Sequence, residues 1–330
     1  MRKLTILIVV LAALYGGYWF VGARAVETGL RDGLADMARS GWQVGYRDLN
    51  TVGFPSRFDT TVDELALTTP DRRFSFAGPF LQVFALSYQP NRIIAVLPEA
   101  FDLAVDGQAI AVENADLRLS AGVQANTDVA LDAVTVDTHA LKVDVQGAGQ
   151  IGVDHLLAAL RDTPDAANRY DIYLGVDEFS LPEQVLRALD PDDRLSGTIT
   201  RITLDAGVTL DKQLDRHALD ARLPAPVVEQ VNLKTLAIDW DGISVVASGE
   251  ITLDALGIPG GQITFKTAEW REIIDLLQRA GVIDAGLAPT LTNAVRAIAA
   301  GDDQLELPVS FQNGFMSVGP LPIGPAPRFR

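Results

Sequence analysis

Residues 243–254, ISVVASGEITLD, alternate between apolar and polar side chains with a period of two. The apolar or small residues occupy every second position: Ile243, Val245, Ala247, Gly249, Ile251 and Leu253. Successive side chains of a β-strand point to opposite faces of a sheet, so this stretch predicts a strand with one buried and one solvated face. Such one-sided strands are typical of antiparallel sheets.

Similar alternation recurs along the chain, at 117–123, 141–145 and 202–210. Dipeptides typical of tight hairpin turns stand between such runs: Asp106-Gly107, Asp241-Gly242 and Asn313-Gly314. Together these patterns predict an α+β chain that is mainly β, with curved antiparallel sheets and a few short helices.

Internal similarity suggests that the β-rich region contains two related halves. Residues 141–156 resemble residues 243–263, because each stretch has an alternating strand, a central glycine and a second alternating piece. We therefore expect one half at 42–210 and another at 232–330, with 211–231 as the connection between them.

A few segments have the apolar spacing of short helices instead: 153–162, 181–190, 267–281 and 288–301. The pattern is clearest in 267–281, where Trp270, Ile274 and Leu277 fall on one helical face. Thr267 is suited to begin this helix and Gly281 to end it.

The N-terminus carries an apolar segment of membrane length. Arg2 and Lys3 precede an uncharged run from Leu4 to Ala23, which as a helix measures about 30 Å, the thickness of a bilayer's hydrocarbon core. We expect a transmembrane signal anchor over 1–23 with a cytoplasmic N-terminus, followed by a juxtamembrane amphipathic helix over 24–41. The alternative is a cleaved signal peptide, for which Gly22 and Ala23 are suitably small. Both interpretations place the rest of the chain outside the cytoplasm.

Composition excludes several classes of function. The chain carries 43 acidic and 27 basic residues, a formal charge of −16, so no nucleic-acid partner is expected. Cysteine is absent, which excludes thiol catalysis, thiolate zinc sites and iron–sulfur clusters. The histidines (His139, His155 and His217) form no metal-binding spacing, and no nucleophile-elbow or phosphate-loop motif is present. The sequence therefore predicts no catalytic residue, no metal and no cofactor.

One motif tests that expectation. Gly147, Gly149 and Gly152 have the G-x-G-x-x-G spacing of a dinucleotide-binding turn. The nucleotide fold places this turn after a strand that is buried on both faces, whereas residues 141–146 are polar at every second position. The pattern favours a glycine kink or bulge in a curved antiparallel sheet.

The most distinctive short string is GFPSRFD, residues 53–59. Its Gly53-Phe54-Pro55 start interrupts the alternation, and Phe58 begins a new strand. Two interpretations stay open for Phe54 and Phe58. They are aromatic anchors of the first strand, or they are contact points for a partner or a lipid chain.

The GFPSRFD string after an N-terminal anchor resembles the domain of unknown function 2125 family of alphaproteobacterial envelope proteins. Residues 247–283 and 305–327 resemble the C-terminal half of that family and, more distantly, the AsmA-like group. The family resemblance implies no activity and no catalytic residues. AsmA-like proteins are membrane-anchored, reach into the periplasm, and several are implicated in outer-membrane biogenesis and thought to carry lipid in an apolar groove.

We therefore expect a non-enzymatic, single-pass protein of the bacterial inner membrane, with the bulk of the chain in the periplasm. Few helices are available to cover many one-sided strands, which leaves apolar surface for lipid or an envelope protein partner. The expected groove-lining residues are Leu117, Leu119, Val129, Leu131, Ile243 and Val245. A scaffold with a closed core and no ligand is the alternative. An exported hydrolase would require a buried pair of carboxylates in a cleft.

Overall fold

A computed structural model describes residues 2–190, 194–218, 223–281, 283, 286, 289, 292–293, 295–296, 305–319 and 321–329. Its strands pair antiparallel, and a long apolar helix stands at the N-terminus, so the predicted fold class is confirmed. The chain divides into two compact units. The first comprises Met1–Ala125 and Val136–Gly147, and the second comprises Asn126–Thr135 and Ala148–Arg330. The two halves expected from internal similarity stay a prediction.

The first unit contains one helix and short to medium strands. In chain order these are α1 (Arg2–Arg39), β1 (Gln43–Gly45), β2 (Asp48–Val52), β3 (Arg57–Thr68), β4 (Phe74–Leu86), β5 (Gln89–Val96), β6 (Ala100–Val105), β7 (Gln108–Glu113), β8 (Arg118–Val123) and most of β9 (Leu131–Val145). Strand β3 pairs with β1, β2 and β4, and β4 also pairs with β5 and β6. The turn at Asp106-Gly107 joins β6 to β7 with positive φ at both residues, as predicted.

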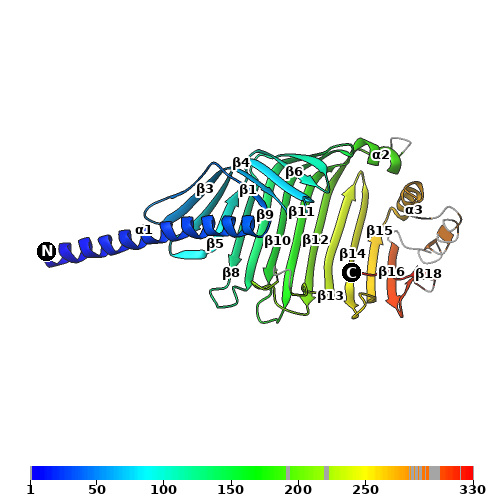
Figure 1. Ribbon diagram of the computed structural model, residues 1–330. Helices are drawn as coiled ribbons and strands as arrows, with labels where there is room; N and C mark the ends of the chain where they lie inside the picture. The colour runs from blue at the N-terminus through cyan, green and yellow to red at the C-terminus, as the bar shows by residue number, and fades with distance from the viewer. Residues whose placement is uncertain are drawn as a thin grey trace. The chain divides into compact units, whose positions relative to one another are not determined.

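The second unit is a meander of long strands in chain order (Figure 1). Its elements are β10 (Gly149–Asp162), β11 (Arg169–Ser180), α2 (Glu183–Leu189), β12 (Thr198–Leu210), β13 (Val228–Trp240), β14 (Ile243–Leu253), β15 (Pro259–Thr267), α3 (Trp270–Arg279), β16 (Leu305–Gln312), β17 (Phe315–Val318) and β18 (Leu321–Pro325). Each strand pairs antiparallel with the next one along the chain.

Helix α1 is continuous from Arg2 to Arg39, so the apolar run and the amphipathic segment form one helix. Among the described residues it is the one helix long and apolar enough to cross a membrane. Gly41, at φ +98°, follows its end and turns the chain toward β1. The helix thus provides a single candidate span with a rigid extension of about 24 Å, from Arg24 to Arg39.

The distal half of α1 packs against β2 and β3. Trp19 and Ala23 form a buried cluster with Phe58, and the Trp19 Nε1–H donates to the carbonyl oxygen of Arg57 over 2.7 Å. Further along, the backbone N–H of Thr51 donates to the Glu27 carboxylate over 2.7 Å. The helix is therefore part of the core of the first unit.

Two of the predicted short helices are confirmed, as α2 and α3. The side chain of Thr267 accepts a hydrogen bond from the backbone N–H of Glu269 over 3.1 Å, at the start of α3. Gly281, at φ +70°, follows the end of that helix, as expected. The predicted helix at 288–301 lies largely outside the described residues.

The predicted helix at 153–162 is wrong, because this segment belongs to strand β10. Its helical spacing arises because β10 is apolar on both faces near its centre.

The nearby glycine motif is neither a nucleotide turn nor a kink within a strand. Residues 146–148 form the turn between β9 and β10, with positive φ at Gly147 and Gly149, and a strand follows instead of a helix.

Asp190 joins the two short helices at the edge of the second unit. Its carboxylate lies at the end of α2 and accepts backbone N–H groups from Leu195 and Arg194 over 2.6 and 2.5 Å. The Arg279 guanidinium of α3 donates to the same carboxylate over 2.9 Å. The hydrogen bond from the Leu195 N–H contributes most to lowering the pKa of Asp190, and those from the Arg194 N–H and the Arg279 guanidinium lower it further.

Candidate functional site

The register of the second unit gathers apolar side chains into continuous rows across its strands. Leu204 on β12 lies opposite Leu174 on β11 and Leu236 on β13. The complete row runs Ala158, Leu174, Leu204, Leu236, Ala247, Phe265 and Leu307. A parallel row runs Leu156, Val176, Ile202, Ile238 and Val245, and another runs Leu160, Ile172, Ala206, Leu233, Gly249, Ile263, Val309 and Val318. We call these three rows the apolar face.

The apolar face is wide enough for extended lipid chains. The central row crosses seven strands, and with strands about 4.8 Å apart it is about 29 Å long. The hydrocarbon layer of one bilayer leaflet is about 15 Å thick. The row is therefore about as long as two acyl chains placed end to end.

Much of this face is only partly buried. Leu174, Leu204 and Leu236, in the middle of the sheet, all keep some exposure to solvent. In the described part of this unit, the buried cluster that joins a helix to the face lies at β16, where Trp270 and Val295 pack with Leu305. Leu174, Leu204 and Leu236 are not part of this cluster.

The opposite face of the same strands is polar and charged. Arg201 on β12 donates to Asp177 on β11 over 2.8 Å, and this hydrogen bond is the main reason that the pKa of Asp177 is lowered. Lys266 on β15 contacts Glu306 on β16 at 2.5 Å. The sheet thus has one face that favours water and one face that does not.

Two carboxylates of the second unit, Asp171 and Asp205, line a depression of about 400 Å³. Lys234 Nζ lies between Asp171 and Asp205, at 3.1 and 3.0 Å from their oxygens. Its hydrogen bonds to Asp205 and then to Asp171 raise the pKa of Lys234. Arg161 also lies 3.4 Å from Asp171, so both carboxylates are paired with cations, and this arrangement does not supply the free acid and base that glycoside hydrolysis requires.

A known protein family matches most of the chain, including residues of both units. A family model described as “Uncharacterized protein conserved in bacteria (DUF2125)” matches residues 19–327. The chain belongs to this family. No curated protein and no solved structure gave a match. The DUF2125 match begins at Trp19, the residue of α1 that packs against Phe58, so the family region includes the distal part of that helix.

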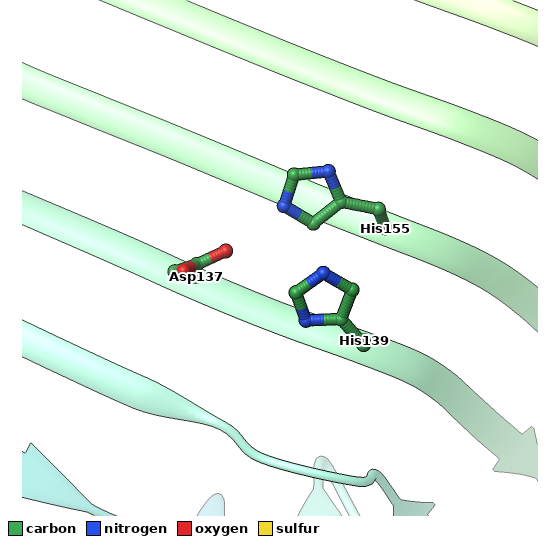
Figure 2. Close-up of side chains that lie close together, drawn as sticks. All are labelled: Asp137, His139 and His155. Atoms are coloured by element: carbon green, nitrogen blue, oxygen red, sulfur yellow. The ribbon is translucent and has the colours of Figure 1, made fainter.

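Two histidines of this DUF2125 protein, His139 and His155, lie beside carboxylates. Asp137 and His139 are two residues apart on β9 (Figure 2), and His139 Nδ1 is 3.1 Å from the Asp116 carboxylate. The backbone N–H of His139 also donates to that carboxylate, which lowers the pKa of Asp116. In the second unit, His155 Nδ1 is 3.7 Å from the Asp177 carboxylate.

The expected groove residues are distributed between the two units. Val245 lies on the apolar face opposite Ile238, and Ile243 lies beside it, opposite Trp240. The others are placed elsewhere: Leu119 on β8 and Leu117 just before it in the first unit, and Leu131 at the start of β9 with Val129 just before it in the second. Alternation identified the strands, but the leucines at the centre of the face depend on pairing register, which no single strand reveals.

Phe54 and Phe58 have different environments in the first unit. Phe58 is buried against Trp19 and Ala23. Phe54 is 56% exposed, and its ring lies 5.5 Å from that of Trp19 and 5.8 Å from that of Phe20. Phe58 therefore anchors β3 to α1, whereas Phe54 presents an aromatic surface to the outside.

Proposed function

We propose that this DUF2125 protein is a non-enzymatic, membrane-anchored protein that binds lipid on the apolar face of its second unit. One observation carries the proposal: apolar residues are in register across seven strands while charged residues occupy the opposite face. The distant AsmA-like resemblance supports a role in outer-membrane biogenesis. The periplasmic location and the inner-membrane anchor belong to the same proposal.

Acyl chains are the occupant that suits this face best. Exposed apolar surface is unfavourable by about 25 cal/mol for each Å², so a broad apolar face that is only partly buried favours a ligand that removes the rest from water. Acyl chains need no hydrogen-bonding partners, and the rows forming the face contain few polar groups. Helix α1 is long and apolar enough to lie in a bilayer, which is a source of such chains.

The packing of α1 supports a retained anchor over a cleaved signal peptide. Trp19 and Ala23 are 5% and 6% exposed, so they are core residues of the first unit. Cleavage after Ala23 would remove both and uncover Phe58. Arg2 and Lys3 before the apolar run favour a cytoplasmic N-terminus.

Site-specific photo-crosslinking tests the proposal. A benzophenone amino acid is placed at Ile238, on the apolar face, and in a matched variant at Ala237, the next residue on the opposite face of β13. The full chain is irradiated in bacterial membranes, purified and examined by mass spectrometry. We expect a lipid adduct at Ile238 and none at Ala237.

Lipid bound around α1 is the same in both variants, so it cannot create this difference. Equal adducts, or no adduct at either position, would contradict lipid binding. A protein adduct at Ile238 would favour the scaffold interpretation.

A further inference from the structure

Two loops of the first unit lie beside the apolar run of α1. A Cβ added to Gly16 would lie 3.8 Å from the ring of Phe54, in the loop between β2 and β3. The Tyr18 hydroxyl donates to the carbonyl oxygen of Ser87, between β4 and β5, over 2.6 Å. The unit therefore contacts the helix within its apolar segment as well as beyond it.

The places where these two loops contact α1 determine how deep the loops lie in a bilayer that the helix crosses. Gly16 precedes Ala23, the last residue of the apolar run, by seven residues, which is about 10 Å of helix. The polar layer on each side of a bilayer is about 5–8 Å thick. When the whole run crosses the hydrocarbon core, Gly16 lies about 10 Å inside the outer edge of that core, so the loops carrying Phe54 and Ser87 reach into the outer part of the hydrocarbon beneath the polar layer.

The side chains around this position are apolar or aromatic and point outward. They are Phe20, Val21, Val52, Phe54, Leu86 and Tyr88, which we call the collar. Val21 and Tyr88 are 71% and 69% exposed. Aromatic side chains are favourable at membrane–water interfaces, so the collar has the composition of a surface that contacts a bilayer.

A hollow of about 710 Å³ opens beside part of the collar. Its apolar walls include Trp19, Phe20, Val52 and Phe54, and its lining also includes Arg24. Arg24 is the first charged residue after the apolar run. Glu27 also lines the hollow, and its carboxylate accepts the backbone N–H of Thr51, so the hollow combines an apolar wall with charges of both signs, which suits the polar headgroup region of a lipid.

We infer that the collar is a second membrane contact, which holds the first unit in the interface of the same bilayer that α1 crosses. The partner is the lipid surface, because the collar continues the apolar surface of the span and lies beside its last turns. The inference rests on α1 being a span. It does not depend on lipid binding by the second unit.

Cysteine labelling tests this inference directly, since the chain has no cysteine. The full chain is labelled with an environment-sensitive fluorophore in Phe54→Cys and Tyr88→Cys variants. The variants are reconstituted into phosphatidylethanolamine–phosphatidylglycerol vesicles, with or without lipids that carry a nitroxide near the top of the acyl chain. We expect blue-shifted emission and several-fold stronger nitroxide quenching than in the control.

The matched control is Val105→Cys. Val105 is also exposed, but it pairs with Phe74 at the far end of β4, twelve residues from Leu86 and about 40 Å away. Circular dichroism of all three variants verifies that they fold.

Quenching at Phe54 and Tyr88 no stronger than at Val105 would overturn the inference. So would a blue shift without nitroxide quenching, because that result would place the collar against protein, such as a second copy. Failure of lipid crosslinking at Ile238 would leave this result unchanged, so the two proposals can fail separately.

Discussion

Replacing Leu204 with glutamate distinguishes an open apolar face from a closed core. Leu204 lies on β12 between Leu174 and Leu236 and is partly exposed. Full burial of a leucine contributes about 1.5–3 kcal/mol, so partial burial here contributes about 1 kcal/mol. If the face is open, the glutamate carboxylate reaches water, and the free energy of unfolding falls by about this amount.

In a closed core the same substitution would bury an unpaired charge. Burial of an unpaired charge is among the most destabilising changes, and it lowers the free energy of unfolding by about 4 kcal/mol or more. The two cases therefore differ by about 3 kcal/mol, which is well above the uncertainty of a denaturant titration.

The assay is urea unfolding of the delipidated full chain, followed by tryptophan fluorescence. Trp240 and Trp270 both lie in the second unit and report on its unfolding. Thr203→Glu, one residue away on the polar face, is the control and should change stability by less than about 0.5 kcal/mol. A loss of about 4 kcal/mol in Leu204→Glu, with a normal control, would refute an open face. If Leu204→Glu loses little stability and also leaves the lipid crosslinking at Ile238 undiminished, a charge at the centre of the face does not impair lipid binding, and this face is not the lipid site.

Three further substitutions test other parts of the structure. Trp19→Ala removes a buried ring and should cost about 3–5 kcal/mol in urea unfolding, whereas Tyr15→Phe, which loses only a hydroxyl, should cost less than about 1 kcal/mol; equal losses would contradict a core role for α1. Gly249→Ala places a Cβ 2.2 Å from a backbone oxygen at φ +153°, and should cost about 2–4 kcal/mol, while Gly260→Ala, with 3.6 Å of clearance, should fold normally. Asp190 has a lowered pKa, so its stabilisation is complete above the ordinary value of 3.8 and is lost as the pH falls through the lowered value. Asp190→Asn should lower the melting temperature at neutral pH and should reduce the amount by which the melting temperature falls in acid. A pH dependence of the melting temperature equal to that of the unchanged protein would contradict this role.

Much of the architecture could be predicted because the alternation of apolar and polar residues is local. Residues 243–253 of this stretch form β14 as expected, and the Asp241-Gly242 turn before them has positive φ at both residues. The exception, 153–162, shows where local pattern is insufficient. Leu156 and Leu157 are adjacent and Leu160 follows at helical spacing, but pairing with β11 places Leu156 and Leu160 on one face and Leu157 on the other.

The candidate site was less predictable because it depends on register and on contacts between distant residues. Leu204 meets Leu174 and Leu236 only after β11, β12 and β13 have paired, and no single strand specifies that offset. The position of Phe54 beside Gly16 similarly links residues that are far apart in the sequence. The string GFPSRFD identified the residues but could not assign Phe58 to the interior and Phe54 to the surface.

The neighbour-to-neighbour pairing from β10 to β18 has a consequence for biosynthesis. Synthesis from the N-terminus delivers these strands in the order in which they pair. Several of these strands join the growing edge after a short loop, such as the Asp241-Gly242 turn between β13 and β14, whereas the connection from Thr267 of β15 to Leu305 of β16 is long. Short closures are fast compared with the joining of remote segments. The second unit can therefore assemble progressively during synthesis, with an unpaired edge that moves forward as each strand becomes available.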